Sequence, residues 1–201
     1  VDVITGLHAT IGVLAALNHR TATGRGQAVE VNLLSSLLSA LVNQAASHVI
    51  GGVVPGILGN AHPSITPYEV YQAADRPIVI AVGNDGQFGK LCEVLGIEAT
   101  ASDMRFATNP QRVANRTVLN DILGGAFASA SADHWWQALT QAGVPCGPIN
   151  RIDQAFALAQ SLDLEPIVTI DHGGQARRQV ANPITFSATP VEYRLAPPDL
   201  P

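Results

Sequence analysis

Residues 2–27 read DVITGLHATIGVLAALNHRTATGRGQ. Large aliphatic side chains recur in this stretch at three- and four-residue intervals, at Leu7, Ile11, Leu14 and Leu17. This spacing predicts a helix over residues 4–20. Because the helix is slim and apolar on several faces, we expect it to pack inside a larger body, against a partner that lies outside this chain.

Composition limits what the rest of the chain can be. Of its 201 residues, 47% are hydrophobic and 13% are charged, which is enough to build the core of one domain or one and a half. The net charge of −5 and the lack of a Lys/Arg block argue against a nucleic-acid partner or an anionic membrane surface. No apolar run reaches the roughly 18 residues of a membrane span, and we find no secretory signal.

The absence of several sequence motifs excludes further classes of protein. Cys92 and Cys146 lie far apart, without a CxxC motif or the His/Cys spacing of a metal site, so we predict reduced thiols, a cytoplasmic protein and no metal. Walker, GxGxxG, HExxH and GxSxG motifs do not occur, which excludes the commonest nucleotide-binding, protease and hydrolase classes. The chain starts at Val1 and ends in a proline-rich run, from which we expect a fragment of a longer protein.

Two parts with different sequence patterns follow the first helix. Residues 28–32 alternate like a short strand, residues 33–50 return to helical spacing, and residues 51–67 are rich in glycine and proline, which predicts a loop or linker. From residue 68 onward the pattern is that of a compact α+β unit. Its predicted strands are residues 68–71, 78–82, 167–170 and 179–186, the last two around the turn His172-Gly173-Gly174, with an extended segment at 145–149. Its predicted helices are residues 85–95, 109–128, 132–142 and 153–161.

Three places are candidates for chemistry. Asp2 stands just before the first helix, where the helix dipole favours an anion, and is either a helix cap or a carboxylate nucleophile. The loop Gly59-Asn60-Ala61-His62-Pro63-Ser64 is either a surface linker or the lining of a cleft, in which Gly59 allows close backbone approach and His62 donates a hydrogen bond. Asp85 lies between a predicted strand and a predicted helix, and is either a helix cap or a general base.

Several motifs in series resemble the class III coenzyme-A transferases, the CaiB/BaiF family. They are Asp2-Val-Ile-Thr-Gly6-Leu-His-Ala with Gly12-Val-Leu-Ala-Ala-Leu17, Thr23-Gly-Arg-Gly-Gln27, Gly59-Asn-Ala-His-Pro63 with Pro67-Tyr68, Gly83-Asn-Asp-Gly-Gln-Phe88 with Leu91-Cys92 and Leu95-Gly96, Arg105-Phe106 with Asn109, and Gly143-Val-Pro-Cys-Gly-Pro148. Each motif is weak alone, but the series runs in order over nearly the whole chain and is specific for the superfamily.

The resemblance implies an α/β protein in which a small α+β domain is joined to a Rossmann-like large domain, and in which two subunits interlock as a homodimer. Residues 1–50 would be a helix and strand of the large CoA-binding domain with the first linker, and residues 51–67 a loop or linker. Residues 68–186 would be the small domain, and residues 187–201 the return linker. The first half of the large domain, with most of the CoA contacts, would lie outside this chain.

Site residues and substrates follow from the same resemblance. Asp2 falls on the family's catalytic aspartate, which exchanges CoA through an aspartyl anhydride and an aspartyl-CoA thioester. No permanently bound cofactor is implied, because CoA and acyl-CoA are substrates together with small carboxylic acids. Leu33 matches a CoA-contacting position. The loop at residues 59–64 matches a glycine-rich flap of some members, but it has one glycine where those have several.

Two alternatives stay open. The α-methylacyl-CoA racemases share this fold and move an α-proton with an Asp, a His and a Glu, and Asp2 and Asp85 match the positions of the Asp and the Glu. Racemases tend to have a glycine cluster after the aspartate, whereas the run Val3-Ile4-Thr5-Gly6 here is transferase-like. The second alternative is a non-catalytic fragment, since the isolated chain would lack the CoA-binding half and is expected to be inactive.

Overall fold

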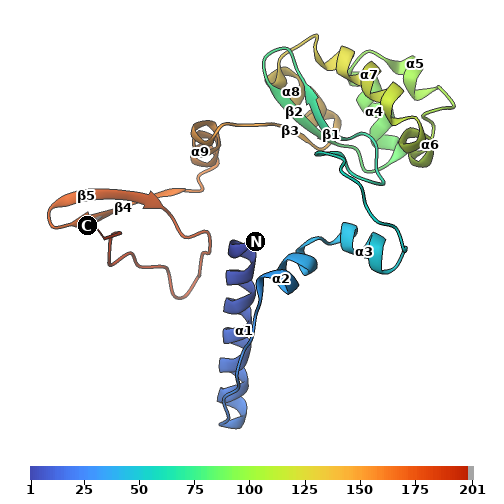
Figure 1. Ribbon diagram of the computed structural model, residues 1–201. Coiled ribbons are helices and arrows are strands. Elements are labelled where there is room, and N and C mark those ends of the chain that lie inside the picture. Colours follow the sequence, from blue (N-terminus) through green and yellow to red (C-terminus); the bar gives the residue numbers. More distant parts are fainter. Residues whose placement is uncertain (199–201) are drawn as a thin grey trace. The chain divides into compact units, whose positions relative to one another are not determined.

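The computed structural model describes residues 1–198, and the chain divides into two compact units, Val1–Gly59 and the part from Asn60 onward (Figure 1). The first unit consists of helices α1 (Asp2–Thr23), α2 (Leu33–Ala40) and α3 (Asn43–Val49). The helix predicted over residues 4–20 is confirmed as α1, which is longer at both ends. It stops at Gly24, whose φ of 73° lies in the left-handed region that favours glycine at a helix end.

The segment that follows α1 runs back along that helix without forming a strand. A Cβ atom at Gly12 would stand 2.7 Å from Val29 Cγ1, so the close approach of the two segments depends on glycine. The strand predicted over residues 28–32 is wrong, because a strand needs a partner for its backbone groups and the first unit, all of it described, has no other strand. The helix predicted over residues 33–50 is instead two helices, since the chain leaves helical geometry at Val42, with a φ of 45°.

Apolar side chains of the first unit stay exposed. Leu7, Ile11 and Leu14 of α1 expose 57%, 63% and 61% of their surface, whereas Ser36 is the unit's one buried residue. A helix with this much exposed aliphatic surface is unusual in a body that is complete by itself. The partner expected for α1 is therefore not found among the residues of its own unit.

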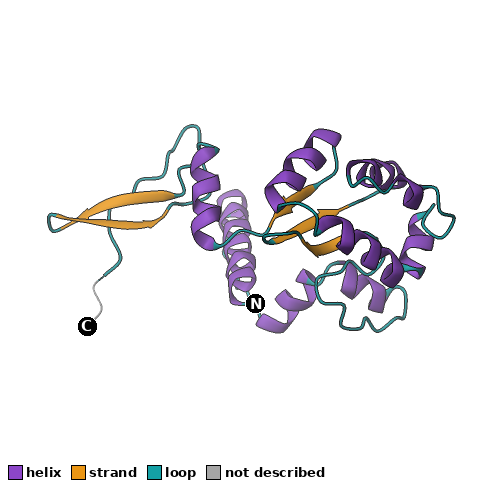
Figure 2. Cartoon of the chain, turned by 90° about the horizontal axis from the view of Figure 1, so that it is seen from above, coloured by secondary structure: helices purple, strands orange, loops and turns teal. Residues whose placement is uncertain are grey.

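The second unit is built on a three-stranded antiparallel sheet (Figure 2). Its strands, in spatial order, are β1 (Tyr68–Gln72), β2 (Pro77–Ala81) and β3 (Cys146–Pro148). The register pairs Tyr71 with Ile78 and Ile80 with Cys146. Both strands predicted between residues 68 and 82 and the extended segment at 145–149 are thereby confirmed.

The helices of the second unit follow the predicted pattern with one break. They are α4 (Asp85–Val94), α5 (Glu98–Ala101), α6 (Asn109–Ala114), α7 (Arg116–Phe127), α8 (Ala132–Ala142) and α9 (Ile152–Ser161). The predictions at 85–95, 132–142 and 153–161 are confirmed, and α5 was not predicted. The predicted helix 109–128 is divided at Asn115, where φ is −110° and ψ is 24°. The Asn115 amide donates to the carbonyls of Arg105 and Gln111, which stabilises this break.

The core of the second unit lies between the sheet and helices α4, α7 and α8. Ile78 and Ile80 of β2 are fully buried there, together with Leu91, Leu119, Leu123 and Leu139 from the helices. Each such aliphatic side chain contributes about 1.5–3 kcal/mol on burial. Two aromatic contacts of Phe127, stacked on Tyr71 with ring centroids 5.1 Å apart and edge-on to Trp135 at 5.9 Å, tie α7 to β1 and to α8.

The last strands form a separate hairpin, β4 (Ile167–His172) paired with β5 (Gln175–Val180). The predicted turn is confirmed, since Gly173 and Gly174 have φ of 61° and 83°, as a two-residue turn of this kind requires. The second strand was predicted too late, at 179–186. No helix or strand lies in residues 187–198 of the predicted return linker, and its residues 199–201 lie outside the described residues. Within residues 1–198, no helix has the length and hydrophobicity to cross a bilayer.

Candidate active site

Asp2 is the first residue of α1, and its side chain is exposed. Val1, rather than Asp2, is the N-cap residue, and its carbonyl accepts hydrogen bonds from the N–H and the hydroxyl of Thr5, each at 3.0 Å. The N–H groups of the first helical turn have no acceptor within the helix, so this end of α1 favours an anion. Of the two roles considered for Asp2, that of a helix cap is therefore not the one observed.

His8 connects α1 to α2. Its Nδ1 lies 3.1 Å from Oγ of Ser36, which is 3% exposed. Helix α2 begins at Leu33 and is capped by Asn32, whose Oδ1 accepts from the N–H of Ser35 at 2.8 Å. Leu33, the predicted CoA contact, is half-exposed at this helix start. Asp2 and Leu33 thus stand at the starts of two helices that a hydrogen bond joins within the first unit.

The predicted active-site loop is attached along the outer edge of β1. Gly59, with a φ of 62°, is in the left-handed region, and the attachment begins directly after it. Asn60 Oδ1 accepts from the N–H of Val70 at 2.9 Å, and the N–H of His62 donates to the carbonyl of Tyr68, also at 2.9 Å. The loop therefore occupies backbone groups that an edge strand would otherwise expose.

The His62 side chain is fixed as well as its backbone. The imidazole stacks on the Tyr68 ring, with centroids 5.1 Å apart and an interplanar angle of 16°. Its Nδ1 accepts from the N–H of Ser64 at 3.2 Å, so the neutral ring has its proton on Nε2. The His62 carbonyl accepts from Arg116 Nη2 at 2.7 Å. In this tautomer the His62 ring has an N–H donor at Nε2, the kind of group that the sequence suggested.

Asp85 is the first residue of α4 and forms an ion pair with Arg112. The cap of α4 is Asn84, whose Oδ1 accepts from the N–H of Gln87 at 2.9 Å. Asp85 Oδ1 accepts from Arg112 Nη2 at 2.7 Å, and the Arg112 side chain is 1% exposed against 57% for Asp85. Asp85 therefore compensates a buried cation, which is a structural role. Its part as a second acid or base stays a prediction.

Arg112 is a residue that the sequence did not reveal as important. Its Nε donates to the carbonyl of Thr66 at 2.8 Å and its Nη1 to the carbonyl of Phe106 at 3.0 Å. The guanidinium also lies 4.5 Å from the centroid of the Phe88 ring, as in a cation–π contact. With Asp85, this one side chain therefore connects the predicted loop, the start of α4 and the segment before α6.

Two neighbours of Arg112 also reach the loop. Asn109 donates from Nδ2 to the carbonyl of Ser64 at 2.8 Å and accepts at Oδ1 from the N–H of Thr66 at 3.1 Å. Arg116 reaches His62, as described above. Asn109, Arg112 and Arg116 are spaced by three and four residues, so a polar stripe at helical spacing was the available signal.

The structure gathers the predicted site residues into two groups. Asp2 and Leu33 belong to the first unit, whereas Asn60, His62 and Asp85 belong to the second. Within the second group, Arg112 bonds both to Asp85 and to the carbonyl of Thr66, which lies two residues after the predicted loop. Gly59 is the last residue of the first unit, so the predicted loop crosses the boundary between the units.

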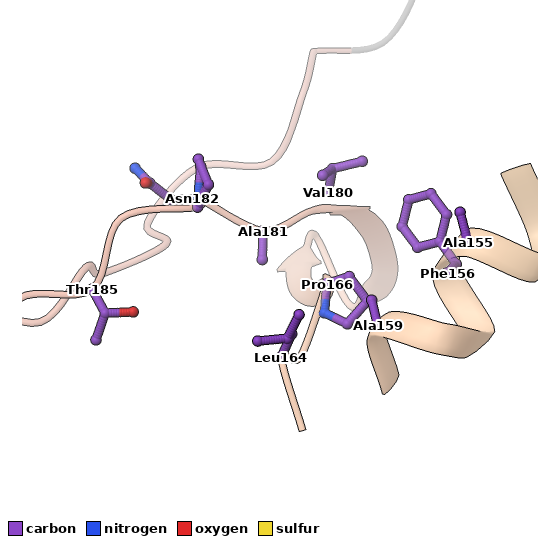
Figure 3. Close-up of a pocket in the computed structure, with 10 residues that line it drawn as sticks. Ala155, Phe156, Ala159, Leu164, Pro166, Val180, Ala181, Asn182 and Thr185 are labelled. Atoms are coloured by element: carbon purple, nitrogen blue, oxygen red, sulfur yellow. The ribbon is translucent and has the colours of Figure 1, made fainter. Parts of the chain in front are cut away.

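None of these residues lines the groove drawn in Figure 3. It measures about 410 Å³ and is formed by α9 and the segments that flank the β4–β5 hairpin. Phe156, Leu164, Pro166 and Val180 line it, and none of its lining side chains is titratable. It therefore offers no group for acyl chemistry.

The two thiols are poor alternatives to a carboxylate nucleophile. Burial raises the pKa of Cys92 to about 11, and burial also raises the pKa of Cys146 despite an opposing hydrogen bond with Thr140. Because the thiolate is the nucleophilic form, a raised pKa makes both cysteines unreactive near neutral pH. No group of three or more His, Cys, Asp or Glu side chains that could hold a metal ion occurs in the described part of the chain.

Comparison with known proteins decides the family. The sequence model described as CoA-transferase family III matches residues 1–201. The chain belongs to CoA-transferase family III. It is similar to a succinate–glutarate CoA-transferase of Agrobacterium fabrum, with 38% identity over 205 residues that cover 99% of this chain and 50% of the relative. It is also similar to the succinyl-CoA:glutarate CoA-transferase of Mus musculus, with 33% identity over 198 residues that cover 98% of this chain and 45% of the relative.

The fold of this family III chain also has a solved counterpart. A crystal structure of a CaiB/BaiF family protein from Brucella suis matches it with a TM-score of 0.74 and 40% identity, over 93% of this chain and 48% of the other. The predicted resemblance and the predicted α/β fold class are confirmed. The chain spans about half the length of the curated relatives it matches. The interlocked dimer stays a prediction.

A first prediction concerns the Arg112 contacts. The change Arg112→Leu leaves the carbonyls of Thr66 and Phe106 without their donor, and we expect the free energy of unfolding to fall by about 2–5 kcal/mol. Urea unfolding followed by tryptophan fluorescence measures this. The control is Arg105→Leu, which removes the exposed pair with Asp103 and should cost less than about 1 kcal/mol. Equal losses in the two variants would contradict the structural role of Arg112.

A second prediction concerns the thiols. At pH 8 the raised pKa of Cys92 leaves about one thiolate in a thousand, so iodoacetamide should not label this buried residue in the native whole protein. Cys146 should react slowly, and labelling of both should accelerate as the pH rises. Peptide mass spectrometry gives the extents, and unfolding in urea serves as the positive control for Cys92. Rapid native labelling of Cys92 at pH 7 would show that the thiol is activated rather than suppressed.

Proposed function

We propose that the whole protein transfers coenzyme A between an acyl-CoA thioester and a free carboxylic acid. The observation that carries this proposal is the match of the family III sequence model to the entire chain. The named relatives support it, since both are named as CoA-transferases. We propose dicarboxylates of the succinate and glutarate class as the acids, because both relatives are named for them.

Asp2 is the proposed nucleophile, and the exchange has four acyl-transfer steps. First, the Asp2 carboxylate attacks the donor thioester, releases CoA thiolate and becomes a mixed anhydride. The thiolate then attacks the aspartyl carbonyl, which releases the donor carboxylate and leaves an aspartyl-CoA thioester. The acceptor carboxylate attacks that carbonyl and displaces the thiolate again. Finally the thiolate attacks the acceptor's carbonyl in the second anhydride, which forms the new acyl-CoA and restores Asp2.

The location of Asp2 suits these steps. An exposed carboxylate at the N-terminal end of α1 is accessible to an acyl-CoA, and the dipole of the helix favours negative charge at this end. Backbone N–H groups of the first turn of α1 are candidates to stabilise the oxyanion of each tetrahedral intermediate. Leu33, at the start of the adjoining α2, is the proposed contact to coenzyme A.

The remaining predicted residues take supporting roles. The loop with Asn60 and His62 is proposed to border the acyl group, with His62 as a hydrogen-bond donor to a bound carboxylate. CoA exchange takes no proton from the α-carbon, so in this reaction we assign Asp85 the supporting role of pairing with Arg112, and its predicted part as an acid or base belongs to the racemase alternative. A racemase would instead need such an acid or base. We propose an interlocked homodimer in the cytoplasm as the working form, and an isolated 201-residue chain without turnover.

The test traps the proposed intermediate in the whole protein. Incubation with succinyl-CoA followed by borohydride should convert the Asp2 side chain to an alcohol, which mass spectrometry of the peptide detects. Asp2→Asn should lose the trap and lower the transfer rate at least about a thousandfold. Glu30→Gln, which changes an exposed carboxylate of the same unit, should leave both unchanged. An unmodified Asp2, with deuterium entering the acyl α-carbon in D₂O, would replace the proposal by the racemase alternative.

A further inference from the structure

The proposed active-site loop and the two residues after it are bonded at every second residue from Asn60 to Thr66. Asn60 and His62 bond to β1, and Ser64 and Thr66 bond to the Asn109 side chain. The Thr66 carbonyl also accepts from Arg112. A loop that moves as a lid in each catalytic cycle has few such contacts, because each would have to break and re-form.

Arg116 holds the middle of this loop. Its Nη2 donates to the His62 carbonyl at 2.7 Å, and its Nη1 donates to Glu69 Oε1 at 3.2 Å. Both members of the ion pair are mostly buried, with Arg116 19% and Glu69 15% exposed. Partial burial reduces the screening of the pair by water, so it is stronger than a surface ion pair.

Helix α7, which begins at Arg116, is itself attached to β1. One turn further along α7, Asn120 Oδ1 accepts from the Tyr71 hydroxyl at 2.8 Å. Burial raises the pKa of Tyr71, so the phenol keeps the proton that it donates. Arg116 and Asn120 are spaced by four residues, so both lie on one face of α7 and reach alternate residues of β1, Glu69 and Tyr71.

An arginine is needed for the contact that Arg116 makes. A guanidinium is planar and presents several N–H groups in a rigid fork, so one group can serve a carboxylate and a carbonyl at once. A lysine ammonium keeps the charge opposite Glu69 but concentrates it at one atom, without the fork. The change Arg116→Lys therefore separates the charge of this side chain from its geometry.

We propose that Arg116 is a positioning residue that holds residues 60–67 as a fixed wall of the acyl site, rather than as a flap that opens and closes. This inference rests on the proposed function, in which the loop borders the acyl group. The wall acts through His62, whose N–H, carbonyl and ring each have a partner in the second unit. Loss of the Arg116 guanidinium leaves the His62 carbonyl without this donor. The imidazole ring of His62 is then held less firmly in its orientation.

Two measurements on the whole protein test this proposal. Hydrogen exchange of the peptide over residues 60–70 follows the bonded N–H groups of His62, Thr66 and Val70. In Arg116→Lys we expect exchange there about tenfold faster, since one charge-assisted hydrogen bond is lost. In the same variant, KM for the acceptor dicarboxylate should rise about fivefold to tenfold with kcat nearly unchanged, because a wall contributes uniform binding. In the wild type, saturating succinyl-CoA should leave the exchange of this peptide unchanged.

The control is Arg151→Lys, whose pair with Asp153 is of the same kind but exposed, at 75% and 66%, and it should alter neither readout.

Strong new protection of residues 60–70 on adding succinyl-CoA would mark a moving flap and overturn the proposal. Faster exchange with an unchanged KM would overturn it too, because the loop would then border no site. Unchanged exchange in Arg116→Lys would show that Arg116 does not hold the loop. A wild type that fails the borohydride trap would refute the proposed chemistry, while the exchange data would still decide whether Arg116 fixes the loop.

Discussion

The second unit depends on one buried cation. A guanidinium inside a protein needs hydrogen-bond acceptors for its N–H groups, or it costs several kcal/mol. Arg112 meets this requirement with the carbonyls of Thr66 and Phe106 and with the carboxylate of Asp85, which come from three segments far apart in the sequence. Since these groups must converge on one side chain, the loop before β1, the segment before α6 and the start of α4 cannot take their positions independently.

This constraint explains how much of the fold the sequence could predict. Local patterns gave α1, α4, α8 and the β4–β5 turn, because spacing, caps and glycines act within a few residues. They failed where the outcome depends on neighbours. Residues 28–32 alternate like a strand but have no partner strand, and the helix expected over 109–128 breaks where the Asn115 side chain takes over two backbone carbonyls.

In the candidate site, too, local patterns predicted some features, whereas others depend on residues far away in the sequence. From its position, Asp2 had two possible roles, and only the resemblance to a family favoured the prediction of a nucleophile, because a carboxylate at a helix start has no distinctive local pattern. The residues that hold the loop were missed for a different reason. Asn109 and Arg116 are 43 and more residues away from their loop partners, so no local pattern reveals which backbone groups they bind. Their helical spacing indicates that they share one face, but not which groups that face contacts.

The proposed chemistry gives a reason for a loop that stays in place. Water can hydrolyse an aspartyl anhydride, so the proposed chemistry favours a site that limits the access of water through all four steps. A lid does this only while it is closed, whereas a wall does it throughout, including between the two anhydrides, when the donor acid leaves and the acceptor acid enters. The loop here is joined to β1 and to the α6–α7 region by hydrogen bonds at every second residue. In the proposed chemistry, the hydrogen bonds that fix His62 and its neighbours would therefore help to keep the activated acyl group on a path that leads to coenzyme A rather than to water.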